Sequence, residues 1–482
     1  MPELIVHSAD GKQALSFEGT PVLYELISHI PDAPSRSCGG SGKCGACAVI
    51  AQGALSSEPD SAGKVLSCQT FVLGDAEVWL PARKKMVQIE TARWEKPYAF
   101  SPLSGSYGAA IDIGTTTIVL ELISLREGKT LAVVSCENPQ RIIAADVIGR
   151  IEGAMQGQLN ILKTLVTNCI DGLEKEAFAQ AGLDGASADW RVIAGNTTML
   201  YLYTGRDPRP LAAAPFEADC LFGIQNAHDI LPACAGAFVG ADITCALLAS
   251  QICQSDETSL LIDIGTNGEL ALWHKGTLTC CATAAGPAFE GCGISCGTGS
   301  IPGAIDSACV KEDRVSFTTI NEASPCGICG SGLIDLTAAL LETEELDETG
   351  FLEDDIELAK DVVLTQQDIR QVQLAKGAIA AGIQTLLEIA GLDESDVSTL
   401  YIAGGFGSHL NLHSAAKIGL IPASMIGKCV VLGNASLAGA RQILLSENGF
   451  AETQRIAQSA CCINLASQKR FTDCFVENML FE

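Results

Sequence analysis

The stretch Ile111-Asp112-Ile113-Gly114-Thr115-Thr116-Thr117 ends one apolar run and leads into another, Ile118 to Leu122. The same arrangement returns at Ile262-Asp263-Ile264-Gly265-Thr266-Asn267-Gly268, which runs into Glu269 to Trp273. Each copy predicts a strand, a tight glycine turn and a second strand. A structural duplication alone would explain two similar hairpins, but it would not explain why Asp-x-Gly-Thr recurs in both turns.

The part of the chain from residue 108 onward is predicted to be an internally doubled α/β structure. Apolar β-like runs alternate with helical patterns there, which is typical of an α/β fold with parallel strands. The strongest helical pattern covers Asp368 to Ala390, and Gly391 supplies a stop. A second pair of similar stretches, Val192 to Asn196 and Val430 to Asn434, supports the duplication. We expect two related halves with a cleft between them.

A third glycine-rich stretch, Ala403-Gly404-Gly405-Phe406-Gly407, follows the two Asp-x-Gly-Thr turns. In this order the three stretches resemble the two phosphate loops and the adenosine loop of the actin, sugar-kinase and heat-shock-chaperone superfamily. The resemblance implies ATP with Mg²⁺, because hydroxyls and backbone N–H groups of such turns bind phosphate oxygens and the aspartates hold the cation through water. The sequence has no Walker A motif and no GxGxxG in strand–helix context.

Roles for individual residues follow from this resemblance. Asp112 and Asp263 would position Mg²⁺ and its waters. The phosphates would lie against the two turns, and the adenosine against the third loop, which gives a candidate nucleotide site of Gly114, Thr115, Thr116, Thr117, Gly265, Thr266, Asn267, Gly268, Glu269, Gly404, Gly405 and Gly407. The attacking water needs an orienting group, and the sequence does not choose between Asn196 and Glu290.

A glycine-rich loop near the N-terminus carries three cysteines at C-x5-C-x2-C spacing, Cys38, Cys44 and Cys47, and Cys68 follows. Four thiolates are what a [2Fe–2S] cluster requires, and the glycines let the loop wrap the cluster without Cβ clashes. The spacing is one residue longer than the plant-type pattern and resembles that of adrenodoxin-type ferredoxins. A zinc site is the alternative, but no paired CxxC follows.

The residues around this loop predict a small α/β domain over residues 1–81. Leu4 to Val6 and Ala14 to Phe17 flank an Asp10-Gly11 turn, which is a hairpin signal. Thr20 is predicted as the N-cap of a helix that ends near Pro31, and a last strand is predicted from Ala76 to Leu80. The stretch 82–107, with Pro97, Pro102 and several Ser and Gly residues, is predicted to be a linker.

The chain has 482 residues, 21 cysteines and a formal charge of −27 from 30 Lys and Arg against 57 Asp and Glu. This acidic surplus argues against nucleic acid or an anionic membrane as a partner, because phosphates would be repelled. The stretch most similar to a membrane span, Cys234 to Cys253, is interrupted by Asp242 and Thr244. Many cysteines without a secretory signal predict a cytoplasmic, reducing and anaerobic setting.

Further stretches extend one family resemblance over nearly the whole chain: Gly195 to Met199, Ala214 to Phe216, Ala284 to Gly291, Cys329 to Asp335 and Gly433 to Ala440. With them the chain resembles the reductive activators of corrinoid proteins, the ATP-dependent reductases that return inactive cob(II)amide to cob(I)amide. The resemblance implies an N-terminal β-grasp [2Fe–2S] ferredoxin domain followed by duplicated actin-like, ribonuclease H-like ATPase domains. We expect these halves over residues 108–255 and 256–482.

The same resemblance implies the partners. The electron acceptor would be a corrinoid protein of a methyltransferase or O-demethylase system, the low-potential electron donor is not named by the sequence, and the ATPase domain is expected to form a homodimer. Two other functions stay open: an ATP-fuelled electron donor to another metalloenzyme, and a redox-sensing binding module with a weak ATPase. Cys292, Cys296, Cys326 and Cys329 leave open a second metal site, although buried thiols beside glycines are the simpler interpretation.

Overall fold

The structure is a computed structural model of the chain, and it describes residues 1–8, 11–28, 30, 33–34, 47–60, 63–80, 96–405 and 409–481. It divides into two compact units. The first comprises Met1–Lys85 and Asn138–Val166, and the second comprises Met86–Glu137 and Thr167–Glu482. Within the described ranges, no helix is both long enough and apolar enough to cross a membrane.

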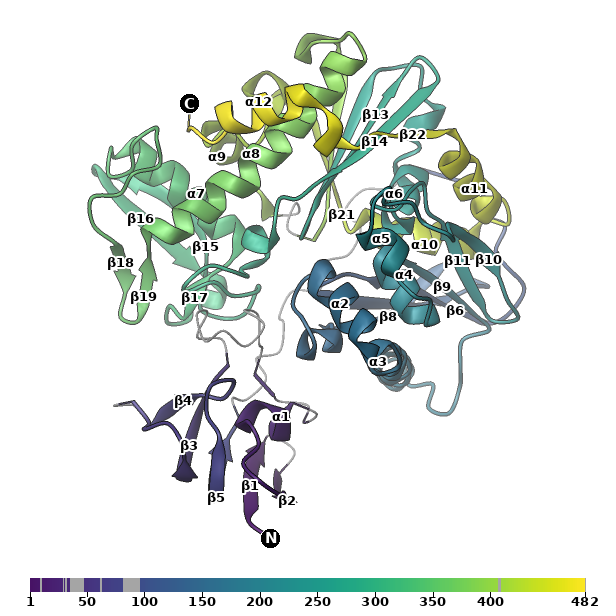
Figure 1. Cartoon of the computed structure of the whole chain (residues 1–482). Helices are drawn as coiled ribbons and strands as arrows, with labels where there is room; N and C mark the ends of the chain where they lie inside the picture. Colours follow the sequence, from purple (N-terminus) through teal and green to yellow (C-terminus); the bar gives the residue numbers. More distant parts are fainter. Residues whose placement is uncertain are drawn as a thin grey trace. The chain divides into compact units, whose positions relative to one another are not determined.

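The first unit contains a five-stranded mixed sheet in the order β2-β1-β5-β3-β4, with one short helix packed on it (Figure 1). The central pair β1 and β5 is parallel, and the flanking pairs are antiparallel. Leu4, Leu23, Ile27, Val72 and Val78 are buried between helix and sheet. This arrangement confirms the predicted β-grasp fold. Its elements are β1 (Glu3–Ser8), β2 (Gly11–Ser16), α1 (Leu23–Ile27), β3 (Ala48–Leu55), β4 (Lys64–Leu66) and β5 (Val72–Trp79).

The predicted hairpin and the helix after it are confirmed, but the predicted N-cap residue is wrong. α1 has Val22 at its N-cap position, without a side-chain cap, and not Thr20. The first helical N–H groups are satisfied from elsewhere in the chain: Leu23 N donates to Thr70 O at 2.7 Å and Tyr24 N donates to Ser67 O at 3.0 Å. Long-range carbonyls therefore replace the local cap, and they tie the helix to the residues on both sides of Cys68.

The second unit opens with a six-stranded sheet in the order β10-β11-β9-β6-β7-β8. β6, β7 and β8 form an antiparallel meander, and β9 and β11 continue the sheet in parallel on the other side of β6. The elements of this half are β6 (Tyr107–Ile113), β7 (Thr117–Ser124), β8 (Lys129–Glu137), β9 (Trp190–Gly195), α4 (Thr197–Thr204), α5 (Arg209–Ala212), β10 (Phe222–Gln225), β11 (Asp229–Ala233), α6 (Ala241–Ser250) and η3 (Ile252–Gln254).

Between β8 and β9 the chain leaves the sheet and forms a helical segment. Most of it, Asn138–Val166, is grouped with the first unit. Its elements are η1 (Pro139–Ile142), α2 (Val147–Gly153), η2 (Ala154–Gln158) and α3 (Leu159–Gln180), and α3 continues into the second unit.

The last half of the chain repeats the sheet of the preceding half. Its order is β21-β20-β12-β13-β14-β22, with an antiparallel meander β12-β13-β14 and parallel β20 and β21. The core strands are β12 (Ser259–Ile264), β13 (Gly268–His274), β14 (Thr277–Thr283), β20 (Thr399–Ala403), β21 (Cys429–Gly433) and the added edge strand β22 (Ala460–Cys462). The predicted duplication and actin-like fold are confirmed, with mixed rather than all-parallel sheets.

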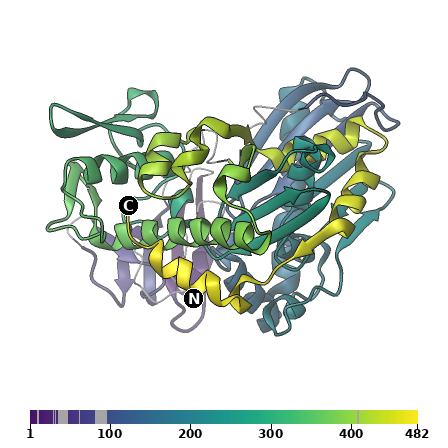
Figure 2. The same ribbon diagram turned by 90° about the horizontal axis from the view of Figure 1, so that it is seen from above.

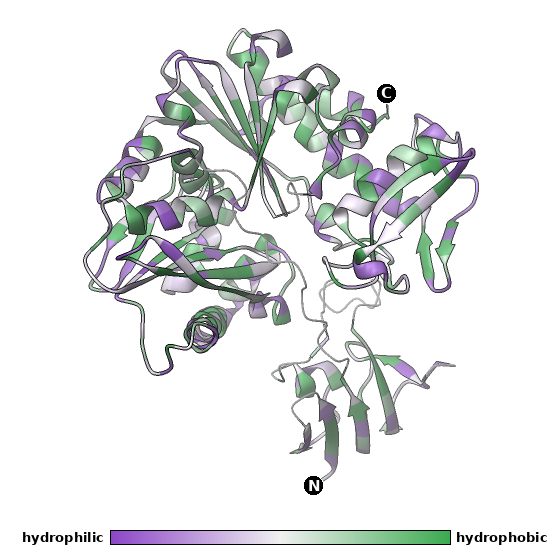
Figure 3. Cartoon of the chain, turned by 180° about the vertical axis from the view of Figure 1, so that it is seen from behind, coloured by the Kyte–Doolittle hydropathy of each residue, from purple (hydrophilic) through white to green (hydrophobic). Residues whose placement is uncertain are grey.

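Smaller elements and helices surround this second sheet. They are η4 (Pro287–Glu290), β15 (Ala304–Lys311), β16 (Arg314–Thr319), η5 (Ile320–Glu322), β17 (Gly327–Ile328), α7 (Gly330–Glu342), β18 (Ile356–Ala359), β19 (Val362–Leu364), α8 (Gln366–Ile389), η6 (Glu394–Asp396), α9 (Leu412–Lys417), η8 (Ala423–Lys428), α10 (Ala435–Leu445), α11 (Gly449–Ser459), η9 (Leu465–Ser467) and α12 (Lys469–Glu477). Figure 3 shows hydrophobic residues along the strands of the three larger sheets.

The second pair of similar stretches does not correspond in topology. Val192 to Asn196 is β9 with the start of α4, whereas Val430 to Asn434 is β21 with the start of α10. In sheet order β9 matches β20, and β21 matches β11. The two stretches are similar because in both places a strand ends at a glycine and the next residue, an asparagine, is the N-cap of a helix.

The longest predicted helix is confirmed as α8. Thr365 caps it in a reciprocal capping box with Asp368, and Gly391 follows its end with a φ of 67°. Figure 2 shows α12 lying along α8. The buried Lys376 in α8 donates to Leu480 O, so the C-terminal residues are fixed on this helix.

The predicted linker, residues 82–107, is described only from Lys96 onward. There the chain is already bound to the second unit: Ser101 N donates to Leu445 O at 3.0 Å and Leu103 N donates to Leu444 O at 2.9 Å. The predicted domain boundaries remain predictions.

The two sheets of the second unit share one buried core, in which α6 and α10 pack against each other. Residues of both halves contribute to it, including Ala110, Ile243, Leu261 and Leu437. At the crossing of the helices, a Cβ on Gly439 would lie 2.1 Å from Cys245 O. Only glycine allows this approach, so the packing of α6 against α10 requires glycine at this position.

We predict that Gly439→Ala destabilises the chain by about 1–3 kcal/mol, because the added methyl must push α6 and α10 apart. Gly172→Ala is the matched control. Gly172 is also helical, in α3, with no atom within 4 Å of an added Cβ, and the change should be neutral or stabilise by up to about 1 kcal/mol. Denaturant unfolding of both variants measures the difference, and equal stabilities would contradict the packing argument.

Candidate functional site

The Asp112 carboxylate lies at the carboxyl end of β6 and is held by the start of α10. Asn434 Nδ2 donates to Asp112 Oδ2 at 2.9 Å, and Ser436 Oγ donates to Asp112 Oδ1 at 2.9 Å. Asn434 also accepts from Leu437 N at 2.8 Å and so caps α10. Burial raises the pKa of Asp112, and the bonds from Ser436 and Asn434 oppose that shift. This carboxylate joins residues that are 322 positions apart in the sequence.

The equivalent turn of the other half carries two facing carboxylates. Asp263 on β12 and Glu269 on β13 are register partners in the antiparallel hairpin. Burial, followed by the charges of Asp242, Asp112 and Glu290, raises the pKa of Asp263 to about 8. Burial and the charges of Asp242 and Asp263 raise the pKa of Glu269 well above its ordinary value. Both hairpins therefore end in the same negatively charged region.

Asp242 is a member of this region that the sequence reading missed. It lies in the first turn of α6, and its Oδ1 accepts from Ile243 N at 2.8 Å. Burial, followed by the charge of Asp112, raises its pKa to about 7. In the sequence it served only as an interruption of an apolar run. The available signal was a single acidic residue in the first turn of an apolar helix that begins eight residues after the end of β11.

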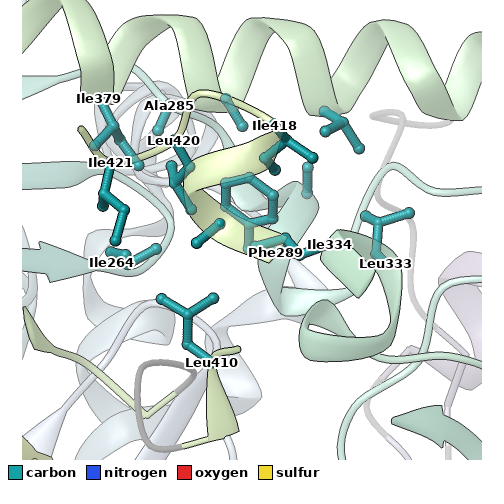
Figure 4. Packing of buried hydrophobic residues seen from close by; sticks show 14 of the residues in the cluster. Ile264, Ala285, Phe289, Leu333, Ile334, Ile379, Leu410, Ile418, Leu420 and Ile421 are labelled. Carbon is teal, nitrogen blue, oxygen red and sulfur yellow. The ribbon is translucent and has the colours of Figure 1, made fainter. Parts of the chain in front are cut away.

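Two threonines of the candidate phosphate turns converge on Glu290. Thr116, after β6, and Thr266, after β12, both donate to Glu290 Oε2, the latter at 2.9 Å. Glu290 ends η4, whose neighbouring Phe289 is 2% exposed and packs among Ile334, Ile418 and Leu420 (Figure 4). The buried ring fixes the position of the carboxylate, so Glu290 connects the turns of the two halves.

Asn196 has two structural tasks. Its Oδ1 accepts from Met199 N at 2.9 Å, which caps α4, and its Nδ2 donates to Thr115 Oγ1 at 3.2 Å. The cap explains why this residue stands directly after β9. Asn196 therefore contacts the first turn, but both of its polar atoms already have partners.

The third predicted loop begins beside Asp263. Ala403, the last residue of β20, is the register partner of Asp263, and Gly404 follows with a φ of 98°. A Cβ at Gly404 would lie 2.5 Å from Ile264 O and 2.8 Å from Asp263 Oδ1. Gly405 follows Gly404, whereas Gly407 lies outside the described residues. The structure thus brings all three sequence motifs to one site as far as it describes them.

Asp112, Asp242, Asp263, Glu269 and Glu290 form a cluster of carboxylates at this site, and the charges of neighbouring members help to raise the pKa values of Asp242, Asp263 and Glu269. A cation would relieve this repulsion. In the described part of the chain, no three His, Cys, Asp or Glu groups are placed to ligate a metal together. Mg²⁺ usually keeps several of its waters and uses few direct protein ligands. The residues therefore fit a hydrated Mg²⁺ held mainly through its waters.

Two of the four predicted cluster cysteines are described, and they lie together. Cys47 and Cys68 have their sulfurs 3.1 Å apart and are buried. Ser67 fixes the pair, since its backbone N–H and its hydroxyl both donate to Cys47 O, at 3.1 and 2.8 Å. Burial raises the pKa of Cys47 to about 11. Two thiols held this close fit shared ligation of a metal, which would keep them as thiolates. Cys38 and Cys44 lie outside the described residues.

The other cysteines in question make separate contacts. Cys296 Sγ accepts from Val363 N at 3.4 Å, Cys326 Sγ donates to Pro302 O at 3.4 Å, and Cys329 lies 3.4 Å from Ser331 Oγ. Cys292, in the loop after η4, is half-buried. No contact here joins the four thiols into a ligand set.

Two duplicated halves that bring Asp-x-Gly-Thr turns and carboxylates together define an actin-like ATPase, and the β-grasp unit with its thiol pair defines an iron–sulfur domain. Family models agree with both. Residues 257–482 match the C-terminal domain of RACo, the ASKHA domain, and residues 107–255 match the RACo middle region. Residues 18–73 match the 2Fe-2S iron-sulfur cluster binding domain.

Individual relatives point to the same family. The corrinoid activation enzyme RamQ of Eubacterium limosum is 31% identical over 418 residues, 78% of this chain and 70% of that protein. A [Co(II) methylated amine-specific corrinoid protein] reductase of Methanosarcina barkeri is 26% identical over 417 residues, 77% of this chain and 76% of that protein. A solved reductive activator for corrinoid,iron-sulfur protein aligns over 100% of this chain and 98% of its own, with a TM-score of 0.74 and 27% identity.

This chain therefore belongs to the family of the reductive activators of corrinoid proteins. It has a [2Fe–2S] domain at the N-terminus and an ASKHA domain that binds ATP.

We predict that the carboxylate cluster makes the metal-free protein less stable as the pH rises. Asp263 titrates near pH 3.9 in an unfolded chain and at about 8 in the fold. The folded state therefore binds its proton more tightly, and the stability present below pH 4 is lost as the pH rises through 8. In EDTA, the unfolding temperature should fall by a few degrees between pH 5 and pH 8.

The Asp263→Asn variant should lose much of this slope, and Asp184→Asn, at an exposed position, should keep it. Thermal unfolding across this pH range is the measurement. A slope that is the same in both variants would show that the cluster does not control it.

Proposed function

We propose that this protein reduces the inactive cob(II)amide form of a corrinoid protein to cob(I)amide by one-electron transfer at the expense of ATP. The observation that carries the proposal is the site at which Asp112, Asn434 and Ser436 join the two halves beside Asp263 and Asp242. It gives a nucleotide site built from both halves, in a chain that also carries an electron-transfer domain.

The cluster supplies one electron at a low potential, near −400 mV in plant-type centres. If the cobalt couple lies ~200 mV lower, the transfer costs about 5 kcal/mol, because ~59 mV corresponds to about 1.4 kcal/mol for one electron. Nucleotide binding offsets this only if the chain's two conformational states differ in their affinity for the corrinoid partner. A site shared by two halves supplies two such states, open and closed around the nucleotide, and the proposal requires that the corrinoid partner binds them with different affinity.

In this proposal the hydroxyls of Thr115, Thr116 and Thr266 and the amide of Asn267 bind phosphate oxygens, together with the turns at Gly114, Thr117, Gly265 and Gly268. Asp112 and Asp263 hold the waters of Mg²⁺, and Glu269 supports them. Gly404 and Gly405, with Gly407, leave room for adenosine. Thr116 and Thr266 now donate to Glu290, so phosphate binding requires these hydroxyls to turn from Glu290 to the nucleotide.

Asp242 is the group that best suits orientation of the attacking water. Asn196 caps α4 and bonds Thr115, and Glu290 accepts two threonine hydroxyls. Asp242 is half-buried, the charge of Asp112 raises its pKa, and its own charge raises the pKa of Asp263. Its pKa of about 7 suits a general base at neutral pH. We therefore assign the water to Asp242, in place of the two candidates that the sequence suggested.

The corrinoid partner is favoured over another metalloenzyme because the relatives that match over most of this chain are corrinoid activators. A redox sensor with a decayed ATPase is disfavoured, because the carboxylates and the hydroxyls of both turns are kept together. A homodimer, the unnamed electron donor and the cytoplasmic setting remain part of the proposal.

The Asp242→Asn variant should hydrolyse ATP at least about 10²-fold more slowly at saturating ATP, because the amide cannot accept the water's proton. The affinity for ATP should change little, since Asp242 is not assigned to the phosphates. Steady-state phosphate release measures both. If Asp242→Asn hydrolyses ATP at the unaltered rate while Glu290→Gln does not, the assignment belongs to Glu290.

The Cys68→Ser variant should lose most of the visible [2Fe–2S] absorption and all corrinoid reduction, but it should keep its ATP turnover. The reason is that Cys68 belongs to the first unit and the nucleotide residues belong to the second. Absorption spectra and phosphate release from the same preparation measure the two properties, and Cys309→Ser, at an exposed thiol, is the control. Loss of ATP turnover in Cys68→Ser alone would contradict independent modules.

The function itself is tested by anaerobic absorption spectroscopy of the reduced protein mixed with a cob(II)amide corrinoid protein, with and without Mg-ATP. Growth of the cob(I)amide band only with Mg-ATP is the expected result. A normal cluster spectrum and ATP turnover without cobalt reduction, across several corrinoid proteins, would assign the electron to another acceptor.

A further inference from the structure

A second pair of thiols lies close together far from the cluster cysteines in sequence. Cys136 is on β8, the edge strand of its sheet, and Cys169 is on α3. Their sulfurs are 2.9 Å apart, and both side chains are half-buried. A disulfide joins sulfurs at about 2.05 Å, so a further approach of roughly 0.9 Å would allow the bond.

The secondary structure on both sides fixes this pair. Cys136 stands in the antiparallel ladder opposite Ile118, two residues after the buried Val134 and therefore on the same face of β8. Cys169 lies next to Ile170 and one turn after Val166, both buried on α3. The thiols thus meet along the seam at which α3 covers the sheet, and neither belongs to the nucleotide site or the cluster site.

The two thiols lie at the two ends of a segment that interrupts the second unit. Cys136 is one residue before the point where the chain leaves the second unit, and Cys169 is two residues after the point where it returns. The residues between, Asn138–Val166, which we name the excursion, are grouped with the cluster domain. A bond between Cys136 and Cys169 would close the excursion into a loop at its neck.

The excursion contacts a residue that packs against two of the predicted cluster cysteines. Tyr24 OH donates to Ile142 O at 3.0 Å, and the Tyr24 ring packs with Cys47 and Cys68. The excursion also has its own polar core, in which Arg150 donates to Ala144 O at 3.0 Å and to Gln140 Oε1 at 3.2 Å. Restraining its two ends would therefore restrain a structured segment that touches the cluster side of the first unit.

We propose that Cys136 and Cys169 form a reversible disulfide when the protein meets a hydroperoxide, and that this bond restricts the excursion. In the first step one thiol attacks the O–O bond of the hydroperoxide, giving a sulfenic acid and releasing water from hydrogen peroxide or the alcohol from an alkyl hydroperoxide. In the second step the other thiol attacks that sulfur, forms the S–S bond and releases water. Two thiols give up two electrons and the peroxide accepts them, and a dithiol reductant reverses the change.

The test uses the full chain with its cluster, treated anaerobically with less than one equivalent of hydrogen peroxide, blocked with an alkylating agent and digested with trypsin. Cys136 then lies in the peptide 130–141 and Cys169 in the peptide 164–175. The expected product is these two peptides joined with the loss of two hydrogen atoms, present before and absent after dithiothreitol. This mapping needs no variant and does not depend on the proposed activity.

Cys169→Ser should abolish the joined peptide, and Cys309→Ser, at an exposed thiol on β15, should leave it. Recovery of both peptides as alkylated thiols or as sulfonic acids, or joined to other cysteines, would overturn the disulfide. Amide hydrogen exchange over residues 138–153 should slow several-fold in the oxidised protein and return after reduction. Unchanged exchange in a protein that carries the bond would overturn the effect on the excursion.

Discussion

Five carboxylates that repel one another at the meeting point of two protein halves are the constraint on which this ATPase depends. Asp112 is anchored by Asn434 and Ser436, and burial together with neighbouring charge raises the pKa of Asp242 to about 7 and of Asp263 to about 8. Carboxylates with pKa values raised in this way are typical of functional sites, where a bound ligand offsets the repulsion. The cluster therefore fits a site at which a cation bound with ATP would relieve the repulsion.

The two sheets of the second unit and the helices between them position these carboxylates. The two sheets share the order of five strands, β11-β9-β6-β7-β8 and β21-β20-β12-β13-β14, which gives each half an equivalent hairpin turn. The packing of α6 against α10 holds the two halves together, with Gly439 against the backbone of Cys245. Asp242 begins one of these helices, and Asn434 and Ser436 begin the other. The two helices that join the halves therefore also position the charged and polar groups of the site.

The sequence predicted the parts of this site that short motifs encode. The turns at Asp112 and Asp263, the glycines after β20, and the helix ended by Gly391 depend on local backbone needs, which residue type and spacing reveal. Asp242 was missed because its role comes from the packing of α6, and a lone Asp in an apolar run has no local pattern. Thr20 was wrongly predicted as a cap because the carbonyls of Ser67 and Thr70, distant in sequence, satisfy α1. The correspondence of β9 with β20 in the two sheets could also not be recognised from local sequence similarity, which had matched β9 with β21.

The proposed function requires that the nucleotide site and the corrinoid partner are energetically coupled through the junction of the halves. Coupling of this kind is reciprocal, so the partner must change the affinity for nucleotide by the same factor. The direct measurement is calorimetric titration of a non-hydrolysable Mg-ATP analogue into the reduced protein, with and without a cob(II)amide corrinoid protein. We expect dissociation constants that differ by roughly 5- to 150-fold, and equal constants would contradict the coupling.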